Sequence, residues 1–443
     1  MSYAERMARE LRHYEETTEV HDLPPAFHYW SNRYVRPQLE SLGFASPDDF
    51  LLRSAAKALE RGGELLSIGS GNADLELRLA RQLAQKGQRD FRIHCLEINP
   101  AMSERGRAAA QAEGLAEHLL FHAEDFNHWR AQRIAALPSS NWTGFDAVWA
   151  NQSLHHVVEL EHLLDEAAAS LRPTGVFLVS DMIGRNGHQR WPTALKMVQE
   201  FWRELPPSYR WNRAFGVNEE WFQDRDCASH SFEGIRAQDI LPLLSERFGF
   251  ELFFAFGNVM DIFVDRTFGG HFQVEREWDR DFLDRVARRD QEAIEGGILP
   301  PTHLLARLRL DKAQYPLPTH VAGPSPAQCL AAMEREQQLP AATTTKDPYL
   351  WDAWPHDPRV ELQQAAKGLA RLARDRETFQ LQAAHLATEL QARTEWAQDM
   401  EQQRDTAMAY VQSLERDVAE RTAWAQGLDR ENLQLSAHIQ RLE

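Results

Sequence analysis

The sequence predicts an α/β protein built around a parallel sheet. Residues 56–182 alternate short apolar runs with segments of helical spacing, which is the pattern of parallel strands joined by helices. One strand-to-helix turn contains the run Gly69-Ser70-Gly71, and the next strand ends on an acid, Glu97. With 443 residues the chain is long enough for two or three domains, and one of them can bury a full core.

Composition and charge argue against several classes of protein, namely nucleic-acid-binding, disulfide-rich, secreted and membrane-spanning proteins. The chain is 43% hydrophobic and 26% charged, which is typical of a soluble protein, and its formal charge of −17 argues against general nucleic-acid binding. Cys95, Cys227 and Cys329 are odd in number and far apart, which favours a reducing compartment without a disulfide framework. The N-terminus lacks a signal-peptide core, and the most apolar window, Phe250–Val264, is too short and interrupted to span a bilayer. We therefore expect a cytoplasmic protein.

The turn after the first strand suits a nucleotide-type cofactor. Gly69 and Gly71 allow the backbone to approach a ligand closely. Glu97 could accept hydrogen bonds from both hydroxyls of a ribose. The sixth position of the dinucleotide fingerprint is Asp74 instead of glycine. Its carboxylate would repel a pyrophosphate, with no basic residue nearby in the sequence to compensate. A phosphate-free, cationic ligand such as S-adenosylmethionine is therefore favoured.

Later segments carry a specific resemblance. They comprise a strand end suited to adenine, a fourth strand with its loop, and a turn with a fifth strand, at residues 121–126, 145–156 and 171–181. With the glycine turn, and in this order and spacing, they resemble the class I S-adenosylmethionine-dependent methyltransferases over about residues 56–265. One departure is Ala73, where many members of that family carry glycine.

The resemblance implies a Rossmann-like, seven-stranded sheet with helices on both faces, closed by a strand pair. For that pair the sequence offers Phe250–Phe256 and Val259–Val264, joined at Gly257-Asn258, with helices from about residue 275 to 310 packing back on the core. The expected parts are an N-terminal helical cap, a cofactor-binding core, a substrate-cap insertion with the closing pair and trailing helices, a linker and a coiled coil, at residues 1–55, 56–182, 183–310, 311–358 and 359–443.

The resemblance also implies roles for individual residues. Asp74 would lie near the methionine ammonium, and Glu97 would bind the ribose. Asp125 would accept from the adenine amine, with Phe126 against the ring, and Asn151 would touch the methionine part. The expected cofactor-binding set is Gly69, Ser70, Gly71, Asp74, Glu97, Ile98, Asp125, Phe126 and Asn151. The alternative for each glycine is a plain tight turn, and for each acid a solvated loop.

His155 and His156 are the candidates for a general base, because histidine titrates near neutral pH and the pair follows the fourth strand. The alternative is that one of them caps a helix or bonds to backbone. Asp181 and Arg185, just past the fifth strand, are further candidates for contact with the acceptor. We predict no metal site, because neither a carboxylate nor a third histidine stands at ligand spacing from the pair.

Aromatic residues in the cap allow two interpretations. Trp30, with Tyr29 and Tyr34, could form a lid over the sulfonium through cation–π attraction, or could simply pack an N-terminal helix. The tryptophans of residues 183–235 could form an apolar or sugar-stacking pocket, and ordinary packing explains them equally well. They are Trp191, Trp202, Trp211 and Trp221.

The C-terminal segment is patterned in heptads. A hexapeptide that begins at Arg393 recurs with one change from Arg421, four heptads later, so the seam is preserved. Asn432 falls at an a position, which favours a parallel, in-register dimer. The alternative is a solvated single helix, because arginines also fall on the seam. The seam positions from residue 411 are Val411, Leu414, Val418, Arg421, Ala425, Leu428, Asn432, Leu435, Ile439 and Leu442.

The expected activity is methyl transfer from S-adenosylmethionine, by a protein that assembles as a homo-oligomer through its tail. Long coiled-coil tails resemble those of enzymes of bacterial surface-polysaccharide assembly, so a glycan or lipid-linked sugar is the first acceptor considered. A small molecule, such as a secondary metabolite or quinone, is the second. A scaffold that binds the cofactor without turnover is a third interpretation.

Overall fold

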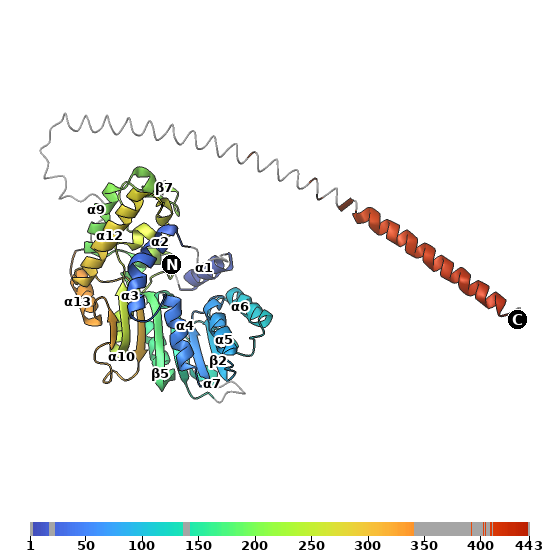
Figure 1. Ribbon diagram of the computed structural model, residues 1–443, viewed down its shortest axis with the longest axis horizontal. Helices are drawn as coiled ribbons and strands as arrows, with labels where there is room; N and C mark the ends of the chain where they lie inside the picture. Colours follow the sequence, from blue (N-terminus) through green and yellow to red (C-terminus); the bar gives the residue numbers. More distant parts are fainter. Residues whose placement is uncertain are drawn as a thin grey trace. The chain divides into compact units, whose positions relative to one another are not determined.

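The computed structural model divides the chain into two compact units, Met1–Lys346 and Asp347–Glu443. Figure 1 shows the first unit as a sheet surrounded by helices. Within these units the structure describes residues 3–16, 23–135, 142–340, 391, 402, 404, 408–409 and 411–441.

An eight-stranded sheet forms the centre of the first unit, in the order β10-β8-β9-β5-β4-β1-β2-β3. The strands that pair in parallel on one side of the sheet are β1 (Gly63–Ile68), β2 (Phe91–Glu97), β3 (Leu119–Ala123), β4 (Phe145–Asn151) and β5 (Leu171–Met182). β1 pairs with β2 on one side and with β4 on the other, so the strand order reverses between β1 and β4. In open parallel sheets, ligands bind outside the carboxyl ends of the strands at such a reversal.

Helices cover both faces of the sheet. The path β1–β2–β3 runs one way across the sheet and β4–β5 the other, so right-handed crossovers place α5 and α6 on one face and α8 on the opposite face. α4 packs against α5, and α8 packs against α10. Their bounds are α4 (Pro47–Ala58), α5 (Asp74–Gln85), α6 (Pro100–Ala112), α7 (Gln132–Ala135), α8 (Leu160–Ser170) and α10 (Ala237–Arg247).

Burial and capping explain why these elements form where they do. Phe145 and Trp149 of β4 are fully buried in the middle of the sheet, as expected for a strand covered on both faces. Asn99 caps the N-terminus of α6, because its side-chain oxygen accepts from the N–H groups of Ala101 and Met102, and Pro100 occupies the first helical position. The end of β2 and the start of α6 are therefore fixed together.

The predicted closing pair is wrong in its second strand. β8 (Gly249–Phe256) forms, but Val259–Val264 contains the short helix α11 (Asp261–Val264). The reason is that Asp290 accepts hydrogen bonds from the N–H groups of Asn258, Val259 and Met260, which directs the chain away from β8. The partner of β8 is β9 (His303–Arg309), which inserts antiparallel between β8 and β5. Its consecutive buried residues Leu304, Leu305 and Ala306 form a short apolar run, a strand pattern that the expected run of helices overlooked.

The predicted linker is also wrong in its first part. β10 (His320–Ala322) adds an eighth strand beside β8, so the sheet exceeds the expected seven. α13 (Pro326–Gln337) follows, capped by a reciprocal pair of hydrogen bonds between Ser325 and Gln328. Glu336 of α13 accepts a hydrogen bond from the N–H of Thr193, which connects this segment to the rest of the first unit, called the head below. Residues 341–358 of the expected linker lie outside the described residues.

The N-terminal segment and the insertion are mainly helical. Figure 1 shows α9 and α12 together at one end of the first unit. The N-terminal elements are α1 (Tyr3–Glu16), α2 (Pro25–Trp30), a π-helical turn (Ser31–Val35) and α3 (Arg36–Ser41). The others are α9 (Pro192–Glu204), β6 (Trp211–Asn212), β7 (Val217–Asn218), α12 (Glu277–Glu295), and short 3₁₀ turns at Leu154–His156, Asn186–His188, Pro207–Arg210, Cys227–Ser229 and Gly269–His271.

The aromatic-lid interpretation is wrong. Trp30 is buried against Phe27 and Phe256, and packs the N-terminal segment on the sheet. The hydroxyls of Tyr29 and Tyr34 both donate to Asp284 of α12. In the insertion, Trp191 and Trp202 are buried too, whereas Trp211 is only partly buried and Trp221 is exposed. Packing explains the buried tryptophans.

The second unit contains a helix over residues 411–439 whose side chains are exposed except for the partly buried Gly427. Its exposed residues include the apolar seam positions Val411, Leu414, Val418, Leu428, Leu435 and Ile439. Most of the expected coiled coil before residue 411, and Leu442, lie outside the described residues. In the part of the chain that the structure describes, no helix has the length and hydropathy needed to cross a bilayer.

Candidate active site

The glycine turn between β1 and α5 is shaped for close approach. Gly69 and Gly71 have φ of +70° and +56°, which disfavours a side chain at either position. A Cβ at Gly69 would lie 2.5 Å from Cβ of Ser153, in the loop after β4. Ala73 adopts φ +62°, so alanine holds the left-handed conformation at the position where glycine was expected. The departure from the family pattern therefore leaves the turn intact.

Glu97 is fixed at the carboxyl end of β2. One oxygen accepts from the N–H of Gly71 at 2.8 Å and the other from the N–H of Asn99 at 2.8 Å. Burial raises its pKa, and these backbone hydrogen bonds oppose that rise. An electrostatic interaction with His156 also opposes that rise, so this histidine lies within electrostatic reach of the acid. A carboxylate has about four lone-pair sites, so Glu97 retains capacity for further donors.

The first turn of α5 holds one predicted acid and one that the prediction missed. Asp74 is exposed there. Glu76 is buried, and accepts from the hydroxyl of Ser67 at 2.5 Å and from the indole N–H of Trp149 at 3.1 Å. Burial raises the pKa of Glu76 to about 7. A glutamate that continues the apolar face of α5, completed by Leu79, Ala80 and Leu83, was the overlooked signal.

Arg105 corrects one premise of the cofactor argument. Its Nε donates to the side chain of Asn72 at 2.9 Å, so a basic group from α6 lies beside the glycine turn. It was not visible as a neighbour in the sequence because 33 residues separate the two positions. The fit to the cofactor therefore depends on Glu97 and on the close approach that Gly69 permits, rather than on an absence of basic groups.

Asp125 and Phe126 follow β3. One oxygen of Asp125 accepts from the N–H and the amide nitrogen of Asn127, and the other from the hydroxyl of Tyr3 at 2.5 Å. Phe126 is buried. The side-chain oxygen of Asn127, which the prediction missed, accepts from the N–H groups of Val158 and Glu159. It therefore ties the end of β3 to the loop after β4.

Helix α1 crosses this edge of the site. Besides the Tyr3 contact, Asn99 donates to the carbonyl of Leu11 at 3.1 Å. Arg6 donates to the carbonyls of Ala228 and Ser231 in the insertion. α1 thus bridges the ends of β2 and β3 to the insertion.

His155 and Asp181 form a buried pair across the ends of β4 and β5. Nδ1 of His155 lies 2.6 Å from a carboxylate oxygen of Asp181. The other oxygen of Asp181 accepts from the N–H groups of Ser153 and Leu154. Burial opposes a charge on His155, but Asp181 and Glu233 outweigh it and raise its pKa to about 10. Burial likewise opposes the charge on Asp181, but His155 and the backbone donors lower its pKa.

Ser153 connects this pair to the glycine turn. Its hydroxyl donates to the carbonyl of Ile68 at 2.7 Å, and its Cβ faces Gly69. Gln152 just before it adopts φ +53°, and its N–H donates to the carbonyl of Ser180. Asn151 ends β4 opposite Ser180 and is partly buried. The histidine pair and the predicted cofactor turn therefore belong to one site.

The structure corrects the prediction that no metal-type cluster forms. Oε1 of Glu233 lies 3.4 Å from Nε2 of His155 and 2.9 Å from Nε2 of His188. Nε2 of His156 lies 3.4 Å from the other Glu233 oxygen, and its Nδ1 lies 3.0 Å from Glu10 of α1. His188 and Glu233 lie far from the pair in sequence, and no local spacing could have revealed them. Arg185, by contrast, turns to the carbonyl of Arg190.

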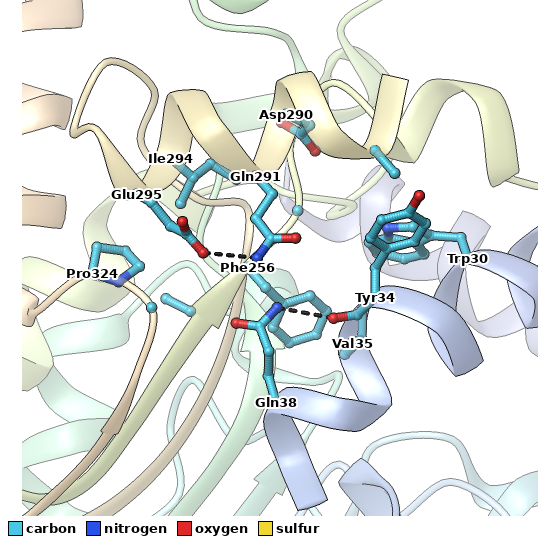
Figure 2. A pocket seen from close by; sticks show the side chains of 14 residues that line it. Trp30, Tyr34, Val35, Gln38, Phe256, Asp290, Gln291, Ile294, Glu295 and Pro324 are labelled. Carbon is cyan, nitrogen blue, oxygen red and sulfur yellow. Dashed lines mark hydrogen bonds between the residues drawn. The ribbon is translucent and has the colours of Figure 1, made fainter. Parts of the chain in front are cut away.

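A separate small cavity lies away from these residues. It has a volume of about 30 Å³ and lies between α12, the π-helical turn and the end of β8 (Figure 2). In Figure 2, Gln38 donates to the carbonyl of Tyr34 and Gln291 donates to Glu295. This volume holds about one water molecule, so the cavity is not a site for a cofactor or substrate.

The parallel sheet, the glycine turn and the acid at the end of β2 define an α/β protein of the nucleotide-cofactor type. Residues 59–230 match the family model described as a methyltransferase domain. This stretch is therefore similar to the methyltransferase-domain family.

Two curated relatives and one solved structure illustrate the similarity. The chain is 29% identical over 125 residues to 27-O-demethylrifamycin SV methyltransferase of Amycolatopsis mediterranei (strain S699), covering 28% of this chain and 40% of that protein. It is 22% identical over 200 residues to dimethylglycine N-methyltransferase of Parasynechococcus marenigrum (strain WH8102), covering 41% and 64%. An O-methyltransferase from a trans-AT PKS multienzyme of Brevibacillus brevis, solved with S-adenosyl-L-homocysteine, shares 12% identity over 65% of this chain and 82% of its own, with a TM-score of 0.35. The chain thus spans less than two thirds of both curated relatives.

Proposed function

We propose that this protein transfers a methyl group from S-adenosylmethionine to a nucleophilic atom of a small-molecule acceptor. The observation that carries the proposal is the link from Gly69 through Ser153 to the Asp181–His155 pair, because it puts titratable side chains next to the cofactor turn. When bound, the cofactor supplies an electrophilic methyl group. The names of both curated relatives describe small-molecule methylation, which supports this acceptor class.

The chain's own residues hold the cofactor as follows. Glu97 accepts the ribose hydroxyls through the lone pairs that Gly71 and Asn99 leave open. Gly69 and Gly71, with Ser70 between them, let the methionine part approach the backbone. Asp125 accepts a hydrogen bond from the adenine amine when the hydroxyl of Tyr3 no longer occupies that carboxylate oxygen. Asp74, Ile98, Phe126 and Asn151 complete the lining.

The two histidines take different roles in this proposal. Both ring nitrogens of His155 face carboxylates, those of Asp181 and Glu233, so His155 positions the cluster. His156 is more exposed and lies between Glu10 and Glu233, so it contacts the acceptor and accepts its proton. Asp181 orients His155. Direct displacement needs the two reactants in line and water excluded, and α1 helps to exclude it.

The acceptor class is tested with the purified full-length protein, labelled S-adenosylmethionine and cell extract. The proposal expects label in a small extractable product. Label in polysaccharide or in a lipid-linked sugar would instead support the glycan acceptor that the tail suggests. If no fraction contains transferred label, the result would favour a scaffold that binds the cofactor without turnover. A Glu97→Ala variant serves as the control for labelling that does not depend on the bound cofactor.

We further propose that two copies of the chain pair through residues 359–443. The apolar seam of the helix at 411–439 is exposed, with Leu428 and Val418 showing 40% and 63% of their surface. A single helix gains nothing from such a stripe, whereas a second copy buries it in register. Asn432, also exposed, would meet its counterpart and favour a parallel pair.

A further inference from the structure

Three ligand atoms converge at the mouth of the proposed site from three separate segments. Nε2 of His155, Nε2 of His188 and a carboxylate oxygen of Glu233 all lie within 4.8 Å of one another. His155 follows β4, His188 follows β5, and Glu233 belongs to the loop that leads into α10. The convergence is therefore a product of the tertiary fold and not of one helix or one loop.

We propose that His155, His188 and Glu233 bind a divalent transition-metal ion. Two imidazole nitrogens and one carboxylate oxygen form a set that suits Zn²⁺, Fe²⁺ and related ions, and leaves coordination positions open. Glu233 retains 39% of its side-chain surface, so the open positions face an accessible side. His156 lies against the second oxygen of Glu233 and is available as a further ligand.

The backbone around His188 adopts an unusual conformation that places its side chain beside Glu233. His188 adopts φ +54°, a left-handed conformation that is unfavourable in a residue other than glycine. In this conformation its Nε2 lies 2.9 Å from Glu233, and its buried Nδ1 has no hydrogen-bond partner among the described residues. A Cβ at Gly234 would lie 2.9 Å from the N atom of His188, so glycine is needed beside it.

Outer contacts and charge also fit a cation. Asp181 holds Nδ1 of His155, which leaves Nε2 directed at the ion in the carboxylate–histidine–metal pattern of many metal sites. The carbonyl of His155 accepts from the N–H of Ile235, which fixes the Glu233 loop against the histidine. Asp181 and Glu233 together carry two negative charges, which balance a divalent ion when both histidines are neutral. Metal binding releases the Nε2 proton of His155 to solvent and requires His188 to carry its proton on Nδ1.

The competing explanation is an ion-pair cluster in which a protonated His155 lies between Asp181 and Glu233. Both explanations use the same contacts, but only a metal site binds Co²⁺ at these residues. The role of the ion, holding an acceptor oxygen or nitrogen beside the methyl group, rests on the proposed function. Metal binding itself does not, and it is measured without cofactor or acceptor.

The test uses untagged full-length protein freed of metal by a chelator and titrated with Co²⁺. We expect visible d–d absorption that saturates at one ion per chain and is abolished by Zn²⁺. His188→Asn and Glu233→Gln should each weaken Co²⁺ binding at least tenfold. Asparagine tolerates the left-handed backbone of residue 188 but is too short to reach the ion. His320→Asn, an exposed histidine on β10, is the control and should bind as the wild type does.

Three results overturn the proposal: no saturable spectrum in the wild type, binding that both site variants retain, or a sulfur-to-cobalt charge-transfer band, which would assign the ion to the exposed Cys227 instead. Circular dichroism checks the fold of each variant. If His188→Asn does not fold, Glu233→Gln still tests the site, because it leaves residue 188 and its left-handed backbone unaltered. S-adenosylmethionine binding by the same samples separates a failure of the metal site from a failure of the proposed function.

Discussion

The hydroxyl of Tyr3 donates to a carboxylate oxygen of Asp125 at 2.5 Å, which joins the first turn of α1 to the loop after β3. The two residues are 122 positions apart in the chain. The same carboxylate is the residue proposed to receive the adenine amine. The N-terminal helix and the cofactor therefore compete for one acceptor.

Tyr3→Phe should tighten S-adenosylmethionine binding. Removing the hydroxyl releases Asp125 from a hydrogen bond worth about 0.5–1.5 kcal/mol, so the dissociation constant should fall roughly twofold to tenfold. Calorimetry measures it. Tyr209→Phe is the matched control, because Tyr209 donates in the same way to Asp279 in another part of the head. Weaker binding by Tyr3→Phe would contradict this prediction, because it would mean that the hydroxyl stabilises the complex with S-adenosylmethionine.

Glu97→Ala should weaken S-adenosylmethionine binding by roughly 1–3 kcal/mol, the usual scale for the loss of a charged hydrogen bond. Glu97 also holds the N–H groups of Gly71 and Asn99, so a thermal melt must accompany the calorimetry. Glu104→Ala, an exposed acid on α6, controls for the change in charge. An affinity unchanged from the wild type would refute the ribose role.

Glu76→Gln should remove a pH dependence of stability. The pKa of Glu76 rises from 4.5 to about 7 in the folded protein, so between these values the folded state keeps a proton that the unfolded chain has lost. Stability therefore falls as pH rises through this window, by on the order of 3 kcal/mol for this one group.

Chemical denaturation from pH 4 to pH 8 checks this prediction. Asp265 and Asp290 have pKa values raised by burial to about 7, so the informative quantity is the free energy of unfolding of the wild type minus that of Glu76→Gln. We expect that difference to decline with rising pH. A difference that stays constant would show that Glu76 does not titrate there.

His156→Gln should lower kcat by about 10²–10⁴-fold if His156 removes the acceptor's proton, with little change in S-adenosylmethionine affinity. His162→Gln is the control, because His162 instead contacts the carbonyl of Trp129. Loss confined to cofactor affinity would assign His156 to binding and not to proton transfer.

Truncation after residue 358 should leave a folded head that binds S-adenosylmethionine with unchanged affinity but has a lower oligomeric state. The head contains the whole sheet and both proposed sites, whereas the exposed seam lies beyond the cut. Light scattering coupled to gel filtration measures the mass. A truncated protein with the same number of subunits as the full chain would rule out assembly through the tail.

The sequence predicted well where the pattern is local. The alternation of strands and helices from β1 to β5, the glycine turn, and the positions of α9, α10 and β8 all appear in the structure near the expected bounds. It predicted poorly where a distant residue decides. Asp290 accepts hydrogen bonds from the backbone after Gly257, where a short helix forms instead of the expected strand. A segment that was expected to be helical forms strand β9.

By itself, the sequence determined a parallel α/β core, a turn that admits a cofactor, and an acid at the end of the next strand, because strand, turn and helix lie within some forty consecutive residues. Only the tertiary structure decided that His188 and Glu233 meet His155, that Tyr3 reaches Asp125, and that Glu76 is buried beneath the turn. Periodicity reports which face of an element is apolar. It does not report which loops meet, because that depends on how the packed elements align their ends.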